Sequence, residues 1–322
     1  MHFHYTEFMA RIFKICVSFI CAVLGLVFSG CGKSSAVWYV QSGYEQAWNT
    51  ILLAAPPPYA FKSVQVWDET IKPSKAGIWI TTEPWEKQGR VAVYPQLSSE
   101  REYQGATVLA LDPWMVFRKH INPGLTLERA ISSAGGEGLL LISGKDPLWV
   151  QAWVSRLVQA RPGEFPADDK VWQETEDNLF RGRRFPPGSQ SYNWQDVLFR
   201  LMGNEHAWVY APLSAIRSYE NPQKSILEAT AFPSSANYRQ YSLHAHKILW
   251  AIPLGSEKKL EKLAEILDWL KKPETQTVIA NTLGWIPADP YGSPYDPVSS
   301  ASQRNWLTST YIYTVNAQEN TE

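Results

Sequence analysis

The sequence is poor in cysteine and carries almost no net charge. It has three cysteines in 322 residues and a formal net charge of −1. Cys16 and Cys21 lie inside an apolar run, so a chain that begins at Cys31 would keep one thiol and no internal disulfide. The sequence also lacks a basic stripe with interleaved aromatic rings, which removes the general case for binding nucleic acid.

Motifs of the common enzyme classes are missing as well. The sequence contains no G-x-S-x-G, no H-E-x-x-H, no phosphate-binding loop and no dinucleotide fingerprint. A carboxylate pair that processes a glycan stays open, because the distance between two carboxylates cannot be read from a sequence. We predict no catalytic residue and no cofactor, and therefore a protein that is not an enzyme.

Two histidines raise the question of a metal ion. His244 and His246 are two residues apart in an extended segment, so they would face one side of a strand. A third ligand would complete a metal site, but no cysteine lies near them, and an exposed or hydrogen-bonded pair is the simpler interpretation. We predict no metal site.

A short basic region followed by an apolar run opens the chain. Arg11 and Lys14 precede the uncharged run 15–28, which is short for a membrane span of about 20 residues and typical of a secretory signal. The run ends in Phe28-Ser29-Gly30-Cys31, which resembles a bacterial lipobox with Phe28 in place of the usual Leu. We expect cleavage before Cys31 and acylation of Cys31, for example with palmitate. An uncleaved N-terminal anchor is the alternative.

Strand and helix patterns alternate along the rest of the chain. Strands are predicted at 36–40, 61–67, 77–82, 89–94, 107–111, 138–143, 207–210 and 241–252, and helices at 44–53 and 194–202. This alternation predicts an α/β fold, and the chain length favours two lobes over one.

The stretch 256–287 predicts two consecutive helices with a sharp corner between them. Apolar residues recur every three or four positions up to Lys272, and Pro273 suits the first position of a new helix. Gly284 suits the left-handed residue that ends a helix. Trp285 would then lie on the loop that leaves the second helix.

The same stretch resembles a signature of bacterial extracellular solute-binding proteins of the sugar type, which feed ABC importers. The matching residues are Leu270, Pro273, Glu274 and Gln276, then Thr282-Leu283-Gly284-Trp285-Ile286-Pro287, in which Leu283 is an insertion. Weaker matches lie at 108–116, 194–210 and 231–233. The resemblance implies a two-lobed periplasmic-binding-protein fold, type II-like, with crossing hinge strands. It places a signal peptide at 1–30, lobe 1 at 31–111 plus 248–288, and lobe 2 at 112–247 plus 289–322.

A small solute would bind in the cleft between the lobes. Ligands of open α/β sheets bind beyond the carboxyl ends of strands, which selects Gln41, Ser42, Glu83, Trp85, Asp112, Trp114, Lys145, Asp146, Trp149, Tyr210 and Trp285. A pyranose offers an apolar face to aromatic rings and hydroxyls to polar groups, so we expect a carbohydrate. Simpler interpretations stay open for the polar residues: a turn cap for Asp112, and a solvated loop for Lys145 and Asp146. Trp38, Trp153 and Trp250 are assigned to the core.

The partners implied are ABC permease subunits and the membrane, reached through the lipid on Cys31. The protein would then lie at the bacterial cell envelope and face the periplasm or the exterior. A different function stays open, in which a surface or envelope lipoprotein keeps the fold but binds a protein partner. Exposed aromatic residues outside the cleft would favour that alternative.

Overall fold

The computed structural model describes residues 37–58, 63–67, 76–82, 92–93, 106–119, 140–141, 143–146, 152–153, 169–181, 188, 191–204, 207–218, 226–232, 242–255, 263–308 and 311–314. The predicted signal peptide, Cys31, Glu83, Trp85 and Trp149 lie outside these residues.

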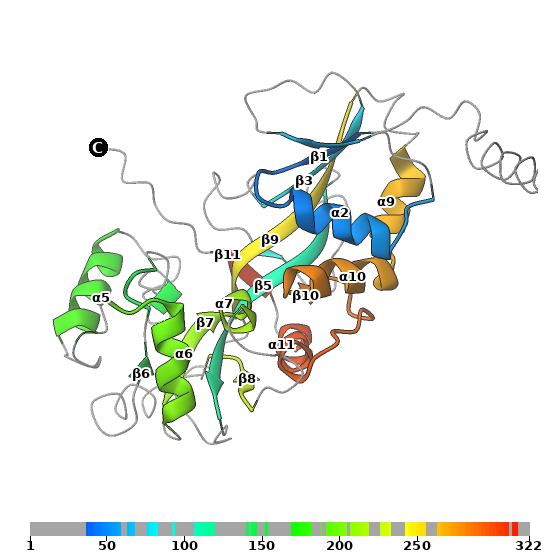
Figure 1. The fold of residues 1–322 in the computed structure, drawn as a ribbon. Helices are drawn as coiled ribbons and strands as arrows, with labels where there is room; N and C mark the ends of the chain where they lie inside the picture. Colours follow the sequence, from blue (N-terminus) through cyan, green and yellow to red (C-terminus); the bar gives the residue numbers. More distant parts are fainter. Residues whose placement is uncertain are drawn as a thin grey trace, which may run out of the picture. The chain divides into compact units, whose positions relative to one another are not determined.

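The described strands form one open mixed sheet (Figure 1). Its main path is β2-β1-β3-β9-β5-β7-β6, in which β1 runs parallel to β2 and β3, and β9 runs antiparallel to β3 and β5. The strands of this path are β1 (Val37–Val40), β2 (Val64–Val66), β3 (Gly77–Thr81), β5 (Thr107–Arg118), β6 (Leu140–Leu141), β7 (Trp208–Pro212) and β9 (Ser242–Leu254). The strands attached beside it are β4 (Ala92–Val93), β8 (Glu228–Thr230), β10 (Ile286–Pro287) and β11 (Tyr311–Thr314).

Strand β5 changes its partners halfway along its length. Its first part pairs with β9 as far as Pro113, and its second part pairs with β7 and β8 from Trp114 onward. The sequence predicts a strand at 107–111 and leaves a turn cap open for Asp112. The predicted end of the strand is wrong, because the strand continues for seven residues more, to Arg118, and Asp112 lies inside it. Proline is tolerated here because the ladder is already irregular at this point.

The predicted helices are confirmed, and the predicted start of the third, at residue 256, lies outside the described residues. They are α2 (Glu45–Ala54), α6 (Trp194–Gly203), α9 (Ala264–Leu270) and α10 (Pro273–Leu283). Asn193 and Asp196 form a capping box at the start of α6. Pro273 opens α10, and Gly284 ends it in the left-handed conformation with φ 77°.

Among the described residues, three further helices were not predicted. They are α5 (Asp169–Arg181), α7 (Leu213–Arg217) and α11 (Pro297–Leu307). Asp296 caps α11 by accepting a hydrogen bond from the Ser299 amide, so an Asp-Pro signal was present in the sequence. Within the described part of the chain, none of the helices combines the length and the hydrophobicity needed to cross a membrane.

Tryptophan supplies much of the core. Trp38, Trp153 and Trp250 are all buried, which confirms their assignment from the sequence. Trp38 packs edge-on against Trp48 at 5.2 Å between ring centroids, and lies 6.1 Å from Trp269 on α9. The ring contacts join the first strand to the helices that cover it.

Candidate functional site

The candidate site lies where β5 exchanges one set of partners for another. In the ladder between β5 and β9, Asp112 pairs with Lys247 and Pro113 pairs with Ala245. His246 is therefore an extra residue on β9, which is the pattern of a β-bulge. A bulge redirects the side chain of the extra residue. Here the extra residue, His246, lies opposite Asp112, the one carboxylate that β5 carries.

Asp112 is fully buried, with no exposed surface. Its Oδ1 accepts a hydrogen bond of 2.9 Å from the Ser214 amide, and its Oδ2 accepts one of 2.5 Å from the Ser214 hydroxyl. Ser214 lies in the first turn of α7, so these bonds tie the start of that helix to β5. Burial raises the pKa of Asp112, against the opposing effects of His246 and the two Ser214 hydrogen bonds.

His246 lies between two carboxylates of different elements. Burial lowers its pKa, while Asp112 on β5 and Asp146 in the turn 143–146 act in the opposite direction. Its Nδ1 is buried and has no hydrogen-bond partner among the described residues. A buried ring nitrogen without a partner is available to a bound polar group.

Aromatic rings surround this polar group. The Trp114 ring lies 5.8 Å from the His246 ring, 5.4 Å from Tyr210 and 6.2 Å from Trp194. Trp194 opens α6 and donates an indole hydrogen bond of 2.9 Å to Asp146. We call Asp112, Trp114, Asp146, Trp194 and His246 the junction cluster.

The structure therefore brings together four of the predicted site residues, which are Asp112, Trp114, Asp146 and Tyr210. Tyr210 was expected at the end of its strand, but it lies inside β7, and its ring packs on Trp153 and Phe232. The expected position is wrong because the strand continues to Pro212. The Tyr210 ring also packs against Trp114, so it links Trp114 to these core rings.

The other predicted site residues in the described part of the chain lie outside the junction cluster. The Gln41 side-chain oxygen accepts hydrogen bonds from the Thr82 amide and from the hydroxyls of Thr81 and Thr82, so it holds the ends of β1 and β3 together. Ser42 and Lys145 are exposed. Trp285 lies on the short segment that leaves α10, as predicted, and it is buried there, with its ring edge-on to Tyr44 at 6.2 Å.

Sequence reasoning missed Ser214, Trp194 and His246 as members of the site. The one signal was His246 beside Lys247, two polar residues inside a largely apolar extended segment. The prediction that His244 and His246 face one side of the strand assumed regular alternation of side chains. The bulge at His246 interrupts that alternation. Within the described residues, no group of three metal-ligating side chains is present.

The arrangement offers hydrogen-bond acceptors, an imidazole and indole faces within one group of residues. Both oxygens of Asp112 already accept hydrogen bonds, so this carboxylate is held in one orientation. Asp146 is held in the same way by Trp194. Such a fixed polar set with aromatic neighbours is suited to recognising a small polar molecule.

Neither a family model nor a curated protein sequence matches the chain. Solved structures do match it. The bacterial solute receptor AcbH, described as having an exclusive preference for β-D-galactopyranose, has a TM-score of 0.62 at 12% identity over 87% of each chain. A probable secreted solute-binding lipoprotein from Streptomyces coelicolor has a TM-score of 0.57 at 15% identity over 89% of each chain. RafE from Streptococcus pneumoniae has a TM-score of 0.57 at 13% identity, covering 88% of this chain and 89% of its own. The chain therefore has the α/β periplasmic-binding-protein fold that bacterial solute receptors share, built on an open mixed sheet.

Proposed function

We propose that the chain is the substrate-binding subunit of an ABC importer and that it captures a carbohydrate between two lobes. The junction cluster carries this proposal, because it gathers aromatic and hydrogen-bonding side chains around β5, the strand that both parts of the sheet share. The fold supports the proposal, since two of the similar structures are named as solute receptors or solute-binding proteins. No catalytic step and no cofactor enter it.

Each part of the cluster has a role in this proposal. The half-buried Trp194 ring covers the C–H face of a pyranose, while Asp146 and His246 bond its hydroxyls. Asp112 and Trp114 have almost no exposed surface, so they hold these residues in place from behind. A wrong epimer is rejected because it leaves Asp146 or His246 without its sugar hydroxyl. Closure of the lobes around the sugar is the motion that the importer detects.

We expect the lobe boundary between residues 111 and 112. The partner exchange in β5 lies two residues further on, because Asp112 and Pro113 still pair with β9 and Trp114 is the first residue that pairs with β7. Gln41, Ser42, Glu83, Trp85, Lys145, Trp149 and Trp285 remain candidate contacts at the rim of the cleft. The junction cluster is the part of the site that we expect to determine affinity.

Ligand screening tests the proposal directly. The full chain is purified in a detergent without a sugar headgroup, and its thermal unfolding is followed with sugars, amino acids, polyamines and divalent metal ions. A sugar present at one hundred times its Kd should stabilise the folded protein by about 2.7 kcal/mol. A shift with metal ions or amino acids and with none of the sugars would overturn the carbohydrate class.

A matched pair of variants tests the site. Asp112→Asn keeps the shape of the side chain but changes its hydrogen-bonding pattern, so calorimetry should find sugar binding at least about tenfold weaker, or about 1.4 kcal/mol. Glu274→Gln makes the same chemical change on the exposed surface of α10 and should bind like the wild type. Equal affinity in both variants would show that Asp112 plays no part in holding the binding site.

The lipid anchor is tested separately from the ligand. Mature protein from membranes should begin at Cys31 and carry acyl chains, which N-terminal mass spectrometry detects. Placement at the cell envelope, facing the periplasm or the exterior, follows from that modification. A chain that begins at Met1, or an unmodified Cys31, would refute the anchor and leave the ligand proposal intact.

A second candidate function has one observation in its favour. Tyr291 and Tyr295 lie on the same loop between β10 and α11 and are 83% and 68% exposed. Exposed aromatic residues are common anchors for a protein partner. An envelope lipoprotein that binds another protein through this loop should lose that partner in Tyr291→Ser, while its sugar binding stays unchanged.

A further inference from the structure

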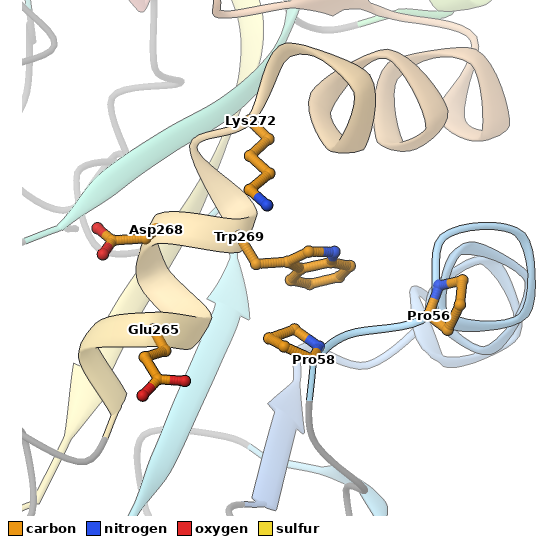
Figure 2. A pocket seen from close by; sticks show the side chains of 6 residues that line it. All are labelled: Pro56, Pro58, Glu265, Asp268, Trp269 and Lys272. Atoms are coloured by element: carbon orange, nitrogen blue, oxygen red, sulfur yellow. The ribbon is translucent and has the colours of Figure 1, made fainter.

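A hollow lies on elements other than those of the junction cluster. It has a volume of about 430 Å³ and is formed by the segment after α2 together with α9 and the corner that follows it. Figure 2 shows the side chains that line it, which are Pro56, Pro58, Glu265, Asp268, Trp269 and Lys272. This volume falls within the range of small-molecule sites.

Trp269 gives the hollow a hydrogen-bond donor. The residue is only 7% exposed, because its ring packs towards Trp38 at 6.1 Å between centroids. Among the described residues, none accepts a hydrogen bond from its indole N–H. Figure 2 shows the ring nitrogen on the open side, between Lys272 and Pro56. The indole nitrogen itself is not among the buried polar atoms that lack a partner, so it can donate to water or to a group bound in the hollow.

Three charged residues line the hollow. Lys272 and Glu265 are both exposed and lie on its rim, one positive and one negative. The carboxylate of Asp268 points away from Trp269 in Figure 2, so Asp268 lines the hollow with the base of its side chain. The walls of Pro56 and Pro58 are apolar. The site therefore offers two donors, one inward acceptor and apolar surface, and its lining residues carry one negative charge more than positive.

We propose that this hollow is a second carbohydrate site, which takes a neutral mono- or disaccharide. Each hydroxyl of a sugar both donates and accepts, so one sugar can bond the Trp269 N–H, the Lys272 ammonium and the Glu265 carboxylate. Its C–H face packs on the proline rings. The proposal stands apart from the importer function, because none of its residues belongs to the junction cluster.

Nitrogen-15 NMR of the tryptophan indoles provides the test. The full chain is labelled, the Trp269 signal is assigned by its absence in Trp269→Phe, and D-galactose, maltose and cellobiose are titrated to millimolar concentrations. The Trp269 signal should shift in a saturable way with at least one of them. If none of the three sugars moves that signal, or if a proline-rich peptide moves it and the sugars do not, the proposal is overturned.

Three further variants make the assignment specific. Glu265→Gln should weaken the sugar by about threefold to tenfold, which is the worth of one hydrogen bond. Glu274→Gln, on the exposed face of α10 and outside the hollow, should leave the Kd unchanged. Asp112→Asn should leave the Trp269 shift intact even if it abolishes binding at the junction cluster. Loss of the shift in Asp112→Asn, or equal binding in Glu265→Gln, would refute an independent site.

Discussion

Replacing Ser214 with alanine would remove one of the two hydrogen bonds that Ser214 donates to Asp112. The hydroxyl bond to Oδ2 is lost, while the amide bond to Oδ1 remains. Asp112 has no exposed surface, so water cannot easily replace the lost donor. The variant therefore isolates what one hydroxyl contributes at the centre of the junction cluster.

The expected magnitude depends on the charge of Asp112. A hydrogen bond to a neutral group contributes about 0.5–1.5 kcal/mol to the free energy of unfolding, and one to a charged group about 1.5–3 kcal/mol. We therefore expect a loss of about 1 kcal/mol where Asp112 is protonated and about 2 kcal/mol where it is ionised. The melting temperature should fall by roughly 2 °C for each kcal/mol in a chain of this size.

The pH dependence has a definite sign. Burial already raises the pKa of Asp112 above 3.8, so the folded protein binds a proton more tightly than the unfolded chain. Stability therefore falls as the pH rises from the unfolded pKa to the folded pKa. The Ser214 hydroxyl lowers the pKa of Asp112, so its removal raises that pKa further and extends the fall. The loss in Ser214→Ala should thus be larger at pH 8 than at pH 4.

Urea unfolding at both pH values measures this difference. Ser218→Ala is the matched control, because the Ser218 hydroxyl is exposed and bonds only the Ser214 carbonyl oxygen, so it should change the free energy of unfolding by less than about 0.5 kcal/mol. A Ser214→Ala loss as small as that of the control would show that the hydroxyl contributes nothing to holding Asp112. A loss that shrinks from pH 4 to pH 8 would show that the bond favours the protonated carboxyl, and would refute the charge-dependent role of Ser214.

Three more predictions concern the frame around the site. Gly77→Ala would press its Cβ into the Val37 carbonyl oxygen, so it should lower the free energy of unfolding in urea by at least about 1–3 kcal/mol. In the control Gly203→Ala, the Cβ meets nothing within 4 Å, so the free energy of unfolding should not fall. Burial lowers the pKa of His246 from 6.5, so its contribution to stability is present above pH 6.5 and is lost as the pH falls. His246→Gln should therefore flatten the curve of unfolding free energy against pH below pH 6.5. An unchanged curve would contradict the lowered pKa of His246. The Gln276 side chain donates to the Val108 carbonyl and accepts from the Asp289 amide at 2.6 Å. Gln276→Leu should therefore lower the free energy of unfolding by at least about 2 kcal/mol. The exposed Thr282→Ala should lower it by less than about 0.5 kcal/mol.

Features set by local chemistry could be predicted from the sequence. The boundaries of α10 follow from Pro273 and Gly284, whose backbone angles are limited by the residues themselves. The apolar spacing before Lys272 likewise indicated α9. The burial of Trp38, Trp153 and Trp250 follows from their place inside apolar runs. Each of these predictions depends on a few neighbouring residues.

Features set by distant partners could not be predicted in the same way. The sequence suggests a turn at Asp112 and Pro113, but β5 continues because β7 and β8 pair with it, and those strands lie about a hundred residues further along the chain. The approach of His246 to Asp112 depends on the register between β5 and β9 and on the bulge in it. No pattern within either strand reveals that register.

The sharing of β5 by both parts of the sheet has a consequence for how its length can change. Side chains alternate between the two faces of a strand, so removing one residue from a strand exchanges the faces of all residues beyond it. In most strands the adjoining loop absorbs such a change before the next element begins. Between the β9-paired and the β7-paired parts of β5 there is no loop. A single deletion there would turn the core-facing side chains of one half of β5 outward. Variants and natural relatives of this chain should therefore carry insertions and deletions elsewhere, and not between Thr107 and Arg118.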